Sequence, residues 1–121
     1  MRVIVESPFA GGFANVKYSR ACIRDALNRG ESPFASHLLY TQAGILDDKI
    51  PDERRRGIDA AIGWLEVADY VAVYVDKGVT TGMVYGIARA GRLGKPIHIR
   101  WIEVKKDDQI IEWTGNELVT A

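Results

Sequence analysis

The fold is decided by residues 69–100, which read DYVAVYVDKGVTTGMVYGIARAGRLGKPIHIR. The apolar, β-rich segment 70–75 stops at Asp76, and a Lys77-Gly78 turn and two threonines follow it. Apolar residues then recur at helical spacing, at Met83, Val84, Ile87, Ala88 and Gly91. A second β-rich segment begins after Lys95-Pro96. The order strand, loop, helix, strand predicts one unit of a parallel α/β sheet.

The loop of this unit is a candidate binding site. In parallel sheets the carboxyl ends of the strands and the adjacent helix N-termini form the crevice where ligands bind. We therefore expect Asp76, Thr80 and Thr81, with Gly82 and Met83 after them, to line a pocket. A structural alternative stays open for each, because Asp76 can accept backbone N–H bonds of the turn and the threonines can cap the helix.

The same alternation predicts the rest of the chain. Strands are expected at residues 3–5, 34–40, 70–75 and 97–104, and helices at 15–29 with Asn15 as cap, from Pro51 onward, and after Thr81. Residues 109–114 either pair back as a hairpin strand or form a loosely held tail. Right-handed crossovers between these strands give a doubly wound α/β sheet with helices on both faces. We expect the strand order 2-1-3-4.

Composition limits the possible functions. The chain has 121 residues, 13.4 kDa and a net charge of zero, which fits a single domain, 1–121, without a field that attracts nucleic acid or an anionic membrane. Residues 1–5 enter a strand without the pattern of a signal peptide, so we expect a cytoplasmic protein. Neither His37 nor His98 has further ligands at metal spacing, and we predict no metal and no cofactor.

Several motifs together resemble the nucleoside 2-deoxyribosyltransferase-like superfamily over about residues 1–100. They are Val-Ile-Val-Glu-Ser-Pro-Phe at residues 3–9, Ala68-Asp69 before the third strand, Asp76 after it, and Gly86-Ile87-Ala88 leading to Gly94-Lys95-Pro96. The chain also resembles a group of small uncharacterised bacterial and phage proteins. The resemblance implies a three-layer Rossmann-like, flavodoxin-like fold that binds a nucleoside or nucleotide, with the sugar near the first strand and the base near the third.

The chain departs from this superfamily at its nucleophile. The resemblance implies a catalytic glutamate two residues before Gly86, where this chain has Val84. Valine has neither a lone pair nor a titratable proton, so the usual double displacement is in doubt, and Tyr85 is only a weak substitute. Glu6 and Asp76 end neighbouring strands, and a pair of carboxyl groups there can replace the glutamate as nucleophile, acid or base.

Further ligand contacts are expected around the first two strands. The candidates are Ser7, Pro8 and Phe9 after the first strand, Asn15 and Tyr18 at the start of the first helix, and His37 and Tyr40 at the second strand. Each has a structural alternative. Ser7 lies in a flexible turn with Gly11 and Gly12, and a lone histidine near a strand end is more often a satisfied structural group.

Three hypotheses follow from these residues. The first is a silent nucleotide-binding protein, such as a sensor or a phage anti-defence protein of the host cytoplasm that sequesters a signal. The second is an enzyme that cleaves or transfers an N-glycosidic bond with Glu6 and Asp76. The third is a protein-interaction module. A homo-oligomer is expected, with Trp64 and Met83 as exposed candidates for its interface.

Overall fold

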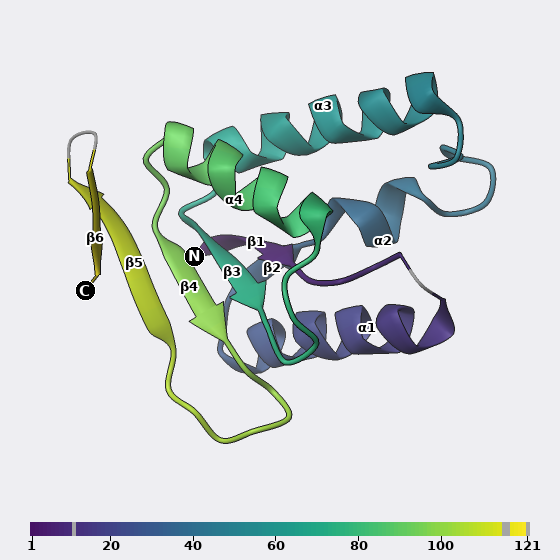
Figure 1. The fold of residues 1–121 in the computed structure, drawn as a ribbon. Coiled ribbons are helices and arrows are strands. Elements are labelled where there is room, and N and C mark those ends of the chain that lie inside the picture. Colours follow the sequence, from purple (N-terminus) through teal and green to yellow (C-terminus); the bar gives the residue numbers. More distant parts are fainter. Residues whose placement is uncertain (11, 115–116, 121) are drawn as a thin grey trace.

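The computed structural model describes the backbone of residues 1–10, 12–114 and 117–120 and the side chains up to residue 112 (Figure 1). The helices are α1 (Phe13–Asn28), α2 (Ser36–Tyr40), α3 (Pro51–Val67) and α4 (Thr81–Arg92), and the strands are β1 (Arg2–Glu6), β2 (Ser32–Phe34), β3 (Tyr70–Tyr74), β4 (Ile97–Arg100), β5 (Gln109–Thr114) and β6 (Glu117–Thr120). No helix in this part of the chain is both long and apolar enough to cross a membrane.

The strands described here form one sheet in the order β2-β1-β3-β4-β5-β6. The first four pair in parallel, and β5 and β6 are antiparallel additions at the β4 edge. The predicted α/β fold and the order 2-1-3-4 are confirmed. Residues 109–114 form the hairpin strand, because the chain turns back after β4 and Ile111 pairs with Ile97.

The sheet lies between two helical layers, with α1 on one face and α3 and α4 on the other (Figure 1). Alternation along β1 divides its side chains between them. Val3 and Val5 join the core under α1, whereas Ile4 packs in the core under α3 and α4. Glu6, two residues after Ile4, therefore points to the α3 and α4 face.

Two predicted strands are too long. The expected strand 34–40 is in fact β2, which ends at Phe34, followed by the one-turn helix α2. Pro33 in β2 has no N–H to donate to a ladder, which suits a short edge strand. The expected strand 97–104 ends at Arg100, because the backbone N–H groups of Ile102 and Glu103 turn away to bind the Asp76 carboxylate.

The starts of the helices agree with the sequence in part. Pro51 occupies the first turn of α3 together with Asp52 and Glu53, as the dipole rule predicts. Asn15 does not cap α1. Gly12, at φ 106°, takes the cap position, and the Asn15 side-chain amide instead donates 2.6 Å to the carbonyl oxygen of Ala10.

A buried ion cluster holds the α1 face to the β4 edge. Arg100 is 2% exposed, and its guanidinium donates to both carboxylate oxygens of Glu31 at 2.7 and 2.6 Å. It also reaches Asp108 at 3.0 Å and the Tyr74 hydroxyl at 3.2 Å, and that hydroxyl donates to Asp25. These side chains satisfy one another's hydrogen-bonding capacity, so we assign the cluster a structural role.

Candidate functional site

Glu6 is the polar group that β1 carries into the α3 and α4 layer. Its carboxyl group lies against Gly86 of α4, where a Cβ atom would be 2.3 Å from Oε1. The α4 helix thus comes this close to the strand end because residue 86 is glycine. The pairing of Glu6 with Val73 places the carboxyl group beside the end of β3, at the edge of the sheet where ligands bind.

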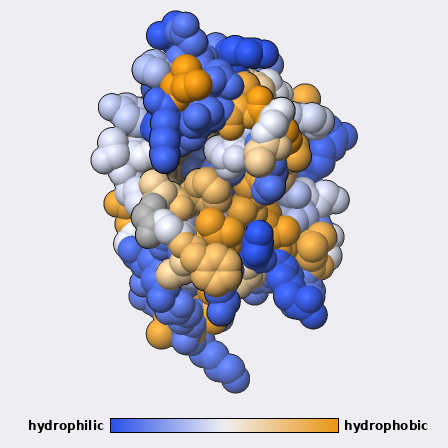
Figure 2. Space-filling view, turned by 90° about the vertical axis from the view of Figure 1, so that its right-hand side faces the viewer, coloured by the Kyte–Doolittle hydropathy of each residue, from blue (hydrophilic) through white to orange (hydrophobic). Residues whose placement is uncertain are grey.

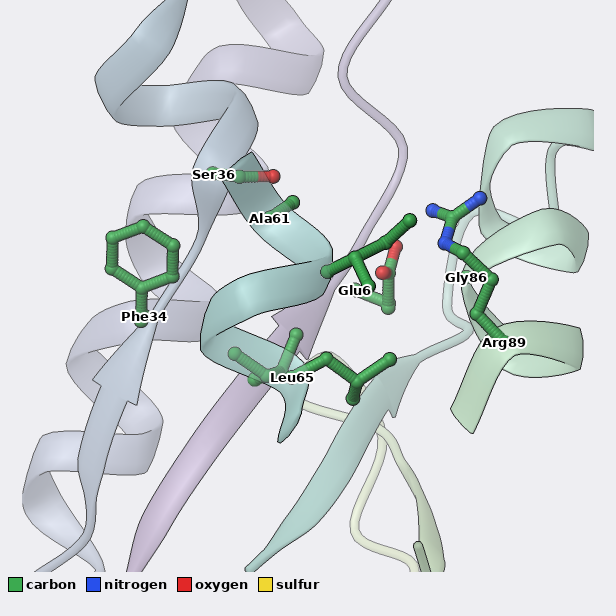
Figure 3. A pocket seen from close by; sticks show the side chains of 9 residues that line it. Glu6, Phe34, Ser36, Ala61, Leu65, Gly86 and Arg89 are labelled. Atoms are coloured by element: carbon green, nitrogen blue, oxygen red, sulfur yellow. The ribbon is translucent and has the colours of Figure 1, made fainter. Parts of the chain in front are cut away.

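A small cavity surrounds this carboxyl group (Figure 3). It has a volume of about 30 Å³ and opens partly to solvent, which is room for one or two water-sized groups. Strand, α2, α3 and α4 residues contribute to its wall. They are Ile4, Glu6, Phe34, Ser36, Ala61, Ile62, Leu65, Gly86 and Arg89.

The two charged residues of the cavity are Glu6 and Arg89. Burial raises the pKa of Glu6 from 4.5 to about 7, and the positive charge of Arg89 opposes this only in part. A carboxyl group with this pKa can hold or release a proton near neutral pH. Figure 3 shows the Arg89 guanidinium turned toward Glu6, yet the two lie beyond ion-pair distance, since no carboxylate of the described residues pairs with Arg89.

Asp76 does not join this site. Its Oδ1 accepts from the Tyr18 hydroxyl of α1 at 2.7 Å and from the N–H of Ile102 at 2.8 Å, and Glu103 donates to Oδ2. Burial alone raises its pKa, but these hydrogen bonds outweigh that effect and hold the pKa below its ordinary value. Because α1 and α4 cover opposite faces of the sheet (Figure 1), the expected Glu6 and Asp76 pair is not formed. Asp76 instead links the end of β3 to α1 through Tyr18 and to the segment after β4 through two backbone N–H groups.

The residues that follow β1 also make contacts within the protein. Ser7 is 3% exposed, and its hydroxyl is 2.7 Å from that of Ser19, which donates to the Pro8 carbonyl oxygen. The Ser7 hydroxyl therefore faces α1 and not the cavity. Phe9 stacks on the His37 ring with centroids 4.8 Å apart.

His37 is buried without a partner. Both ring nitrogens are shielded from solvent and lack a hydrogen bond within the described residues. Burial lowers its pKa from 6.5 to about 4, against a weaker opposite effect of Asp48, so the ring is neutral at pH 7. The expected ligand contact of His37 stays a prediction, whereas the alternative of a satisfied structural histidine is wrong, since neither ring nitrogen has a partner within the described residues.

Tyr40 belongs to an aromatic cluster and not to the cavity wall. Its hydroxyl accepts from Trp64 Nε1 at 2.9 Å, and its ring meets Phe34 edge-on. Trp64 is 51% exposed, as expected from the sequence. The Phe34 ring links this cluster to the cavity, because Phe34 also lines the cavity.

The start of α4 is capped by its own side chains. The Thr80 hydroxyl accepts from the Met83 N–H, so the capping alternative holds for Thr80, while Thr81 and Gly82 are exposed at the same end. Met83 is 2% exposed and packs in the core, which corrects its expected place on a ligand or subunit surface. Val84 is 53% exposed and is absent from the cavity wall.

Sequence reasoning missed Gly86 and Arg89 as site residues. A signal for Arg89 exists, because it follows the buried Met83 and Gly86 at three-residue steps and so lies beside the apolar stripe of α4. An arginine there faces other helices instead of open solvent. Ser36 also lines the cavity, because the helix α2 replaces the expected strand there.

The carboxyl edge of the sheet carries an apolar surface. Figure 2 looks onto the side of the molecule toward which β1 and β3 run in Figure 1. Apolar residues gather at its centre between more polar regions above and below, and the surface is hollowed beside them. A flat, apolar part of a ligand has a place to lie here.

Comparison with solved structures agrees with the fold. The 2-deoxyribosyltransferase of Bacillus psychrosaccharolyticus has a TM-score of 0.66 and 16% identity, over 84% of this chain and 72% of the other. The CMP N-glycosidase BcmB of Clostridium botulinum has a TM-score of 0.49 and 16% identity, over 88% and 73%. No curated protein matches the chain in sequence. Residues 1–100 match a family model, and the chain therefore belongs to the family described as Domain of unknown function (DUF7768).

Proposed function

We propose that the protein binds a nucleoside-derived small molecule, a nucleoside or nucleotide, at the carboxyl edge of its sheet beside Glu6. The observation that carries the proposal is the Glu6 carboxyl group, which lies half-buried in the wall of the cavity and has no hydrogen-bond partner among the described residues. Partial burial makes such a group costly to keep without a partner. A ligand that supplies the partner accounts for keeping this residue.

The kind of ligand is argued from the fold. The neighbour with a TM-score of 0.66 is a 2-deoxyribosyltransferase, a protein described as a catalyst for nucleoside synthesis. This is an argument by analogy, because one fold hosts many functions. The cavity beside the end of β1 and the apolar surface that Figure 2 shows support the analogy, since a sugar needs polar contacts and a base needs a flat apolar one.

Binding without the usual transferase chemistry is the form we favour. The position that the superfamily resemblance assigns to the nucleophile is Val84, which is 53% exposed. Asp76 is occupied by Tyr18 and two backbone N–H groups and offers no second carboxyl group. In its finer form the proposal is that the protein sequesters or senses a nucleotide signal, as a phage anti-defence protein does in the host cytoplasm.

Incubation with a panel of nucleosides, nucleotides and NAD-derived molecules tests the proposal, with the bound and free fractions analysed by mass spectrometry. The expected result is one retained compound that leaves intact on heating. Glu6→Gln is expected to weaken retention, whereas the exposed Glu66→Gln in α3 leaves it unchanged. If no compound is retained by the wild-type protein, the proposal fails, and the protein-interaction alternative takes its place.

Hydrolysis of an N-glycosidic bond is the second candidate, and the Glu6 pKa of about 7 favours it. A carboxyl group that exchanges its proton near neutral pH suits general acid–base catalysis. Glu6 then acts without Asp76, which binds on the other face. Free base and sugar in the same mass-spectrometry experiment, absent with Glu6→Gln, identify this activity.

A homo-oligomer also remains a proposal. Trp64 exposes half of its surface on α3, and large aromatic residues are enriched at subunit interfaces. Size-exclusion chromatography with light scattering tests it. A monomer at micromolar concentration rejects it, and Trp64→Ala is expected to dissociate a genuine oligomer.

A further inference from the structure

The cavity beside Glu6 holds a second polar group without a partner, the Arg89 guanidinium. No carboxylate of the described residues lies within ion-pair distance of it, although both Arg89 and Glu6 line the cavity. The contrast with the buried Arg100 is direct, since Arg100 is bound by two carboxylates. A guanidinium in a cavity wall with no acidic partner favours an anion from outside.

The other groups of the cavity leave Arg89 as the main electrostatic feature. From α3 the wall receives only Ala61, Ile62 and Leu65, and from α2 the hydroxyl of Ser36. Glu6 is the remaining charged group, and below pH 7 it carries a proton. In that state it does not repel an anion but donates a hydrogen bond to it. Guanidinium, carboxylic acid and hydroxyl together offer three kinds of donor to one oxyanion.

The size of the cavity decides which part of a ligand enters it. About 30 Å³ accommodates one or two water-sized groups, whereas whole-ligand pockets measure about 300–1,000 Å³. A nucleobase or sugar ring therefore stays outside the cavity. One or two terminal oxygens of a phosphate group fit this volume, while the rest of the group stays at the mouth of the cavity, which opens partly to solvent.

We propose that the cavity between α3 and α4 is a phosphate subsite, in which Arg89 pairs with a phosphate monoester and Glu6 donates a hydrogen bond to it. The inference rests on the proposed function for the rest of the ligand, which becomes a nucleoside monophosphate rather than a nucleoside. Arg89 is then the residue that discriminates between the two, and Gly86 keeps the Glu6 carboxyl group in place.

Isothermal titration calorimetry tests the subsite with three probes: a nucleoside, its 5′-monophosphate and inorganic phosphate. A charge-assisted hydrogen bond is stronger than a neutral one, so we expect the monophosphate to bind at least about tenfold more tightly than the nucleoside. In Arg89→Gln this preference falls to about twofold or less, since the pair is lost. Arg92→Gln removes an exposed arginine from the same helix outside the cavity wall and leaves the preference unchanged.

Proton linkage gives a second readout. A phosphate group next to Glu6 raises the pKa of the carboxyl group further, so binding at pH 7.5 takes up protons. Titrations in buffers of different ionisation enthalpy measure this uptake. We expect it in the wild-type protein and in Arg92→Gln, and we expect it to vanish in Glu6→Gln. Affinity for the monophosphate should fall as the pH rises above 7.

The outcomes separate the two proposals. Equal binding of nucleoside and monophosphate, with no proton uptake, overturns the phosphate subsite and leaves the proposed function standing. Binding of inorganic phosphate through Arg89, without any gain from an attached nucleoside, supports the subsite and overturns the nucleoside-derived ligand. If none of the three probes nor any other 5′-monophosphate binds, the subsite is overturned as well.

Discussion

The two faces of the sheet treat buried charge in opposite ways. Under α1, Arg100 is surrounded by Glu31, Asp108 and Tyr74, and every charge has a partner within the chain. Under α3 and α4, Arg89 and Glu6 face one cavity without protein partners. Both faces contain a buried or partly buried arginine and acid, so residue type alone does not separate them.

The two faces differ in whether protein groups complete the hydrogen bonds of the buried charges. A satisfied cluster contributes to a unique folded state and costs little beyond its desolvation. An incomplete one lowers stability and persists where a ligand completes it. The comparison therefore predicts that changes on the α1 face reduce stability, whereas changes on the α3 and α4 face alter binding and its dependence on pH.

The largest loss of stability is expected for Arg100→Met. Removing one partner of a buried ion pair leaves Glu31 without its counter-ion and with only the Tyr70 hydroxyl as a donor among the described residues, which lowers the free energy of unfolding by about 3–5 kcal/mol. Urea denaturation measures it. Arg55→Ala is the matched control, because the Arg55 and Asp52 ion pair is exposed and contributes less than about 0.5 kcal/mol. Similar small losses in both variants would remove the contrast between the faces.

The next effect is a pH dependence that Glu6 imposes. Its pKa is about 7 in the folded protein against 4.5 for the free group, so the folded state binds more protons between these values. Stability from Glu6 is thus complete below pH 4.5 and is lost as the pH rises through 7, by roughly 3 kcal/mol. Glu6→Gln removes this loss, so its stability relative to wild type increases from pH 5 to pH 8.

His37 opposes Glu6 in part of this range. Its pKa is about 4 when folded and 6.5 otherwise, so its contribution to stability is present above 6.5 and is lost as the pH falls through 4. Between pH 4.5 and 6.5 the two slopes partly cancel in the wild-type protein. His37→Phe is expected to uncover the falling slope of Glu6, and Glu6→Gln the rising slope of His37. Parallel urea-midpoint profiles for all three proteins would contradict this.

The smallest effect on stability, with a large one on binding, is expected for Gly86→Ala. The new Cβ atom meets the Glu6 carboxyl group at 2.3 Å and displaces it, at about 1 kcal/mol after the gain in helix propensity. Gly63→Ala in α3 is the control, because nothing lies within 4 Å of its added Cβ, and it stabilises by about 0.5–1 kcal/mol. Calorimetry with the retained ligand should show weaker binding in Gly86→Ala and unchanged binding in Gly63→Ala.

The α/β fold and the strand order could be predicted because β-rich segments alternate along the chain with segments of helical apolar spacing, and this pattern is local and repeated. The errors came where tertiary contacts override local pattern. Residues 36–40 look like a strand by apolar content yet form a helix turn after Pro33, and residues 101–104 leave the sheet because Asp76 takes two of their N–H groups. The contact of residues 101–104 with Asp76 is not visible in their local sequence.

The candidate site was predicted in part for the same reason. Glu6 was found, because a carboxyl residue at the end of an apolar strand stands out. Its supposed partner Asp76 was not, since one residue of difference along a strand moves a side chain to the other face. Arg89 and Gly86 join the site only because α4 packs against β1. Gly86 and Glu6 are 80 residues apart in the sequence, and no local pattern predicts that they meet.

The β5 strand has a consequence for how the protein should be produced. The family model ends at residue 100, but Ile111 of β5 packs on the core and pairs with Ile97, and Asp108 binds Arg100. A shortened chain of residues 1–100 would expose β4 as a bare edge rich in isoleucine and strip a buried arginine of one acid. Such an edge invites aggregation, so the boundary of sequence similarity is a poor place to cut.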